Sequence, residues 1–101
     1  MSGIEVASGL GIGDGTGMRT LDTQCPAGKG ALSGGYIVRN SENETGDGDG
    51  VGRDRSKVAV LEFYPITPNG GTPTRASPPS GWRLVTLNAS WREIFVVCYQ
   101  P

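Results

Sequence analysis

Apolar side chains in this chain recur at every second residue, and no stretch repeats them at the three- or four-residue spacing of a helix. The alternation is clearest near the C-terminus, where strands are predicted over residues 81–88 and 92–99. One face of these two strands carries, in order, Trp82, Leu84, Thr86, Ile94, Val96 and Cys98. Because alternate side chains of a strand point to opposite faces, the pattern predicts an all-β fold with almost no helix.

Three further strands are predicted, over residues 20–24, 31–40 and 56–64. In the second of these, Leu32, Tyr36 and Val38 share a face, and the pair Gly34-Gly35 indicates a bulge or a close backbone crossing. In the third, one face carries Val58, Val60, Glu62 and Tyr64, and the other carries Lys57, Ala59, Leu61 and Phe63. Since both faces hold apolar groups, this strand suits the centre of a sandwich.

Two long connections separate the strands. Residues 41–55 are polar and rich in glycine, which predicts an exposed hairpin tip. Residues 65–80 contain five prolines, which predicts a long ordered loop or a pair of turns. With 101 residues in total, the chain has room for one small domain. We therefore expect a small antiparallel β-sandwich, resembling a jelly roll, over residues 21–101.

Residues 1–20 are predicted to form an extended glycine-rich arm. Glycine occupies every second position from 9 to 17, so an extended arm has one face of nearly bare backbone. The other face would carry Ile4, Val6, Leu10 and Ile12. A bare face lets another sheet approach closely. The arm is expected to dock, on its own body or preferably on a neighbouring subunit, with a flexible linker as the alternative.

The chain has two cysteines, Cys25 at the start of the body and Cys98 near its end. Two cysteines placed in this way favour a disulfide that ties the first and last strands together. Two reduced thiols in the core are the alternative, because cysteine is often buried. A thiolate metal site is not expected, because two thiolates without histidine cannot supply four ligands.

Composition argues against several classes of function. Nine basic and ten acidic residues give a net charge of −1, so no basic surplus attracts nucleic acid. No run of about 18 apolar residues spans a membrane, and the N-terminus lacks the pattern of a signal peptide. Histidine is absent, and the clear carboxylates lie in the polar loop, so we expect no enzyme and no cofactor.

Asp47 and Asp49 lie close together in the polar loop and suggest calcium, because hard cations prefer clustered carboxylates. The complete calcium-loop pattern does not fit, since no glutamate follows at the required distance. A solvated hairpin tip is the favoured interpretation of this loop, and no metal site is expected.

Five short motifs together resemble a small all-β module of bacteriophage virion proteins and of bacterial secreted or collagen-like surface proteins. They are CPAGK at 25–29, LSGGY at 32–36, PSGW at 79–82, LN at 87–88 and VVC at 96–98. The resemblance covers about residues 22–100. It implies a displayed or assembly domain without a catalytic motif. Ser33 stands where glycine is commoner in that pattern, and the loop at 41–55 is longer than typical.

These observations lead to two expectations of function. The first is a virion decoration or tail-associated subunit, located in the virion, which the arm anchors to other virion proteins and to copies of itself. The second is a carbohydrate- or cell-surface-binding module that is extracellular or on the bacterial surface. In that case Trp91, predicted to lie exposed in a turn, would stack on a glycan. Neither expectation involves nucleic acid or a membrane.

Overall fold

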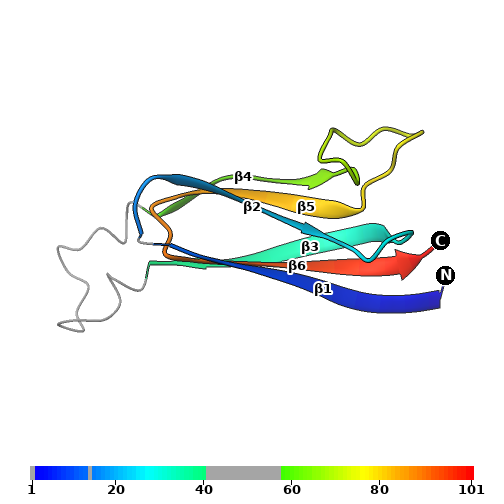
Figure 1. Cartoon of the computed structure of the whole chain (residues 1–101), viewed down its shortest axis with the longest axis horizontal. Helices are drawn as coiled ribbons and strands as arrows, with labels where there is room; N and C mark the ends of the chain where they lie inside the picture. The colour runs from blue at the N-terminus through cyan, green and yellow to red at the C-terminus, as the bar shows by residue number, and fades with distance from the viewer. Residues whose placement is uncertain (1, 14, 41–57) are drawn as a thin grey trace.

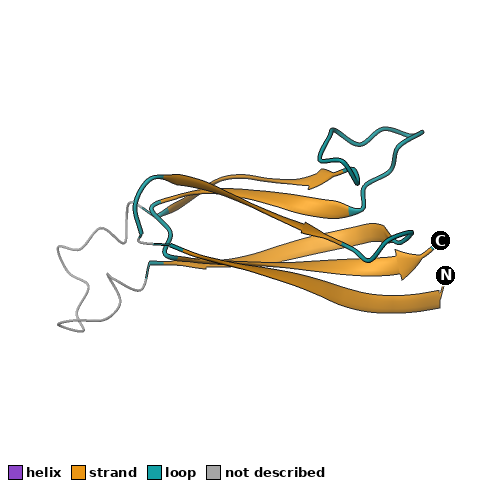
Figure 2. Cartoon of the chain, viewed as in Figure 1, coloured by secondary structure: helices purple, strands orange, loops and turns teal. Residues whose placement is uncertain are grey.

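A computed structural model of the chain describes residues 2–13, 15–40 and 58–101. Within these ranges there are six strands and no helix, as the alternating pattern predicted (Figure 2). None of these residues therefore forms a helix able to cross a membrane. The strands are β1 (Ser2–Ile12), β2 (Met18–Gln24), β3 (Gly30–Arg39), β4 (Ala59–Ile66), β5 (Gly81–Leu87) and β6 (Trp91–Gln100).

The strands form two antiparallel sheets of three strands each, stacked as two layers (Figure 1). Sheet A has the order β1-β6-β3, and sheet B has the order β2-β5-β4. The chain crosses between the layers three times before β4, and once more after β5. The two termini lie side by side at one end of sheet A (Figure 1). The prediction of a small antiparallel β-sandwich is therefore confirmed.

The core lies between the two sheets and is built from the predicted inward faces of β5 and β6. Its buried members are Cys25, Ala31, Leu84, Ile94, Val96 and Cys98. Aromatic rings extend this core toward β3 and β4. Phe63 stacks on Trp82 with ring centroids 4.8 Å apart, and Tyr36 meets Phe63 edge-on at 4.9 Å. Such pairs stabilise beyond the area they bury.

Cys25 and Cys98 form the predicted disulfide. Cys25 follows the last residue of β2 in sheet B, and Cys98 lies in β6 of sheet A, so the bond joins the two layers. The two residues are 73 positions apart in sequence. Closing a loop of that length restricts the unfolded chain and is worth roughly 4 kcal/mol in the chain-entropy description.

Two bulges change which side chains face the core. In β3 the register shifts between Ala31 and Ser33, which leaves Leu32 exposed rather than on the inner face with Tyr36. The close crossing expected at Gly34 is present, because a Cβ on Gly34 would lie 2.9 Å from the Trp82 ring. The bulge itself lies earlier in the strand than Gly34-Gly35.

In β4 the register shifts between Val60 and Glu62. Val60 and Phe63 therefore both pack against the core, although strict alternation predicted them on opposite faces. The strand also continues through Pro65 to Ile66, two residues beyond its predicted end. Proline is tolerated there because β4 is an edge strand, and its position in sheet B is not the central one that the sequence suggested.

The segment expected to be a separate arm contributes to sheet A. β1 pairs with β6 of the same chain, in continuous register from Glu5↔Cys98 to Ile12↔Trp91. β2 begins at Met18 and so runs across the domain boundary that the sequence suggested after residue 20. Within one chain, residues 2–12 therefore form an integral strand of the sandwich.

Candidate functional site

The outer surface of sheet A is predominantly apolar, and we call it the apolar face. Its members come from all three strands and are Ile4, Val6, Leu10, Ile12, Ile37, Trp91, Phe95, Val97 and Tyr99. On β6 they alternate with the buried residues Ile94, Val96 and Cys98, so they point away from the core. The four side chains predicted for the arm therefore lie in a larger surface.

Strand pairing arranges these side chains in rows across the sheet. Val6 lies beside Val97, and Leu10 lies beside Glu93, which in turn neighbours Ile37. Directly opposite side chains on one face of a sheet are in contact range of each other, so the apolar groups share one surface, which Ser8 and Glu93 interrupt.

The side chains of β1 on this surface are strongly exposed. Their exposed fractions are 56% for Ile4, 62% for Val6, 49% for Leu10 and 67% for Ile12. Single exposed apolar residues are common on soluble proteins, but a contiguous apolar patch marks a surface that binds another molecule. Four such residues on one edge strand, beside three rings of β6, meet that description.

The opposite face of β1 is nearly bare, as the alternating glycines predicted. A Cβ on Gly9 would collide with Thr23 Oγ1 of β2, and a Cβ on Gly11 would lie 2.8 Å from Arg92 Nη2. The second sheet thus approaches β1 closely at Gly9, while Arg92 fills the space beside Gly11. The inner face has no room for side chains at Gly9 and Gly11. The large apolar side chains of β1 therefore all project from the outer face.

Arg92 is a buried cation beside Gly11. Its side chain points inward from β6 and the residue is 6% exposed. Burial lowers the pKa of the guanidinium, and the charge of Arg19 lowers it further. Its Nε has no hydrogen-bond partner among the described residues. The side chain packs under the glycine face of β1 and does not open onto the apolar face.

Trp91 does not lie in a turn, because it is the first residue of β6 and is half-buried. Its indole Nε1 donates a hydrogen bond to Glu93 Oε1 at 3.2 Å. The guanidinium carbon of Arg39 lies 5.9 Å from the centroid of its ring. One charge of each sign is therefore held around Trp91, and a sugar stacking on the ring would compete with Arg39.

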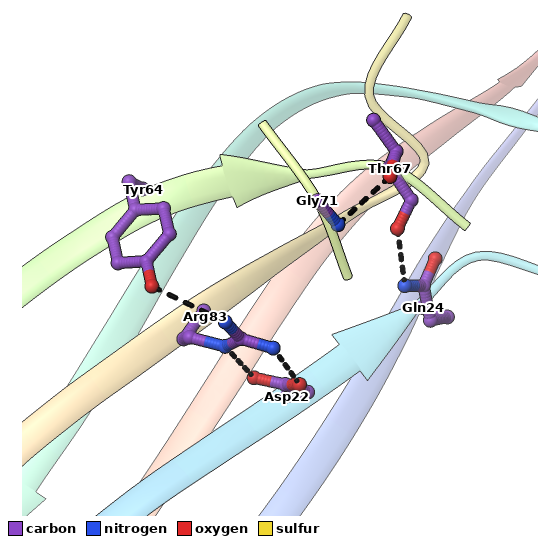
Figure 3. Close-up of polar contacts among 6 residues, drawn as sticks. All are labelled: Asp22, Gln24, Tyr64, Thr67, Gly71 and Arg83. Atoms are coloured by element: carbon purple, nitrogen blue, oxygen red, sulfur yellow. Dashed lines mark hydrogen bonds and ion pairs between the residues drawn. The ribbon is translucent and has the colours of Figure 1, made fainter. Parts of the chain in front are cut away.

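The outer surface of sheet B is different, because it carries paired charges. Arg83 of β5 donates two hydrogen bonds to the carboxylate of Asp22, at 2.7 and 2.8 Å (Figure 3). A third bond reaches the Tyr64 hydroxyl at 3.3 Å. The hydrogen bonds to Asp22 and then Tyr64 raise the pKa of Arg83 above its ordinary value. This pattern is typical of a surface in contact with water.

A cavity of about 550 Å³ lies at the disulfide end of the sandwich. It is lined by the CPAGK segment, by prolines of the loop after β4 and by Tyr99. Three polar side chains around it, Gln24, Lys29 and Ser80, are already paired. Gln24 Nε2 donates to Thr67 O at 3.0 Å (Figure 3). Ser80 donates to Gln24 Oε1 at 2.5 Å, and Lys29 forms an ion pair with Glu5. The cavity can hold an apolar group but offers few free polar contacts.

The described residues contain no group of three or more carboxylate, thiol or imidazole side chains that could hold a metal ion. Asp47 and Asp49, named for calcium, lie outside the described residues. Trp91 does not line the cavity, and Tyr99, which does, lies at the other end of β6. The structure thus does not bring the predicted stacking residue and the cavity together.

Comparison of the chain with protein-family models, with curated proteins and with solved structures found no match. The resemblance to a virion module therefore remains a prediction from the sequence.

Proposed function

We propose that the chain is a non-enzymatic structural subunit that is held in a larger protein assembly through its apolar face. The observation that carries this proposal is the high exposure of Ile4, Val6, Leu10 and Ile12 on one face of sheet A. Full burial of one such side chain is favourable by roughly 1.5–3 kcal/mol. While these four side chains remain exposed to water, much of that stabilisation is missing. Covering the face with another protein recovers that free energy.

The resemblance of the CPAGK, PSGW and VVC motifs to virion modules suggests which assembly this is. We propose a bacteriophage virion, in which the chain is a decoration or tail-associated subunit. The contact is made by sheet A, and sheet B with its hydrated Arg83–Asp22 pair faces the solvent. In this description β1 serves as the predicted anchor while remaining a strand of its own sandwich.

Carbohydrate binding has less support in the geometry. Trp91 is engaged with Arg39 and Glu93, and Ser80, Gln24 and Lys29 beside the cavity already have partners. Sugar sites need free hydrogen-bonding groups that converge on an aromatic plane. For this reason we propose assembly as the function.

The proposal is tested with particles purified on a density gradient from cells that produce the chain. We expect the wild-type chain to migrate with the particles. The variant Val6→Lys should remain at the top of the gradient, because a charge in an apolar contact costs several kcal/mol. Equal migration of both chains with the particles, or of neither, would overturn the proposal.

A further inference from the structure

We infer that the apolar face binds the same face of a second copy of this chain, so that two copies of sheet A pack face to face around a two-fold axis. The inference rests on the proposed function, and it identifies a second copy of the chain as the protein that covers the face. It is carried by the charge, shape and area of the face.

The charge of the apolar face permits self-association. Its ionisable side chains are Arg39 and Glu93, one of each sign, and both contact Trp91. The face therefore carries no net charge, and two copies do not repel each other when they meet. The chain as a whole has a net charge of only −1. A nucleic acid or an anionic lipid surface would instead require a cluster of basic side chains.

The shape of the face suits a second sheet of the same twist. Two sheets that pack face to face align within about 30°, and they do so because each has the same handed twist. Two copies of sheet A have the same twist because they are the same sheet. Phe95 projects from the middle of the face between Ser8 and Gly35. A Cβ on Gly35 would have no neighbour within 4 Å among the described residues, which leaves space beside Phe95 for a partner's side chain.

In plan the face covers about 460 Å², somewhat more than half of what a standard interface buries on each partner. Three strands of about ten residues make a surface roughly 33 Å long and about 14 Å wide in plan. The relief of the side chains raises the accessible area toward the roughly 800 Å² per partner of a standard interface. Symmetric pairs of one patch are also the commonest way in which a single chain assembles.

Sedimentation equilibrium of the full chain tests this inference over a wide range of concentrations. We expect the wild-type mass to approach twice the 10.5 kDa of one chain as concentration rises. Val6→Lys and Ile12→Lys should each weaken dimerisation by about 30-fold or more, because each places a charge in the contact. Met18→Lys is the matched control, since Met18 and Ile12 are both 67% exposed and Met18 lies on sheet B. That variant should stay within about two-fold of the wild type.

Urea unfolding guards against loss of the fold and is carried out in dilute solution, where the wild type is monomeric and dimerisation adds nothing to its stability. All three variants should then keep the wild-type midpoint because the replaced side chains are exposed. A monomeric wild-type chain at every concentration overturns the inference. A dimer that tolerates both Val6→Lys and Ile12→Lys also overturns it, since another surface must then hold the copies together. The wild-type chain could be monomeric and still migrate with the particles while Val6→Lys does not. That result would leave the proposed function standing and would refute only the second copy as the partner.

Discussion

At the scale of single residues, the glycines of β1 determine where its apolar side chains can lie. Gly9 and Gly11 occupy the inner face because Thr23 and Arg92 leave no room for a Cβ there. This arrangement could be predicted from the sequence, since alternation alone separates the glycines from Val6 and Leu10. Which neighbours the bare face would meet could not be predicted, because Thr23 and Arg92 come from two other strands.

Substitution of Gly9 tests the close approach of β1 to sheet B. We expect Gly9→Ala to lower the free energy of unfolding by about 1–3 kcal/mol, because the added methyl group overlaps Thr23 Oγ1. Gly35→Ala is the matched control on the outer face of the same sheet, where the new Cβ meets nothing within 4 Å. It should change stability by less than about 0.5 kcal/mol in the same urea titration. Equal effects of the two changes would contradict this description.

At the scale of elements, the sequence predicted five of the six strands within a few residues of their bounds, and predicted residues 1–20 to be extended. It could not predict that β1 pairs with β6, because strand pairing over about ninety residues leaves no local signal. The position of the bulge in β3 and the bulge in β4 were missed for a related reason. Each inserts one residue, Leu32 or Leu61, into an otherwise regular alternation, and the apolar side chain of that residue looks like a core position.

Removal of β1 tests whether residues 2–12 belong to the fold. Without this strand β6 loses one of its two ladders, and Ala7 is lost from the edge of the core. We expect a chain that starts at residue 14 to lose about 3 kcal/mol or more of unfolding free energy. A chain that lacks only residues 1–3, before the continuous pairing begins, is the control. Unchanged stability of the longer deletion would mean that the segment is an arm after all.

At the scale of the whole molecule, the two outer surfaces of the sandwich differ in kind. Sheet B presents the Arg83–Asp22 pair to water, whereas most outward side chains of sheet A along β1 and β6 are apolar. The sequence indicated the four apolar residues of β1 but not Phe95, Val97 or Tyr99. Alternation along the strand puts those three on one face without showing whether that face is inward or outward.

The central claim is that the apolar face is covered by protein when the chain assembles. Hydroxyl-radical footprinting measures this directly at two matched leucines, Leu10 on the apolar face and Leu61 on sheet B, which are 49% and 47% exposed. In the dilute chain both should be oxidised at similar rates. In the concentrated or particle-bound chain we expect the rate at Leu10 to fall several-fold while that at Leu61 is unchanged. Equal rates in every state would contradict the claim.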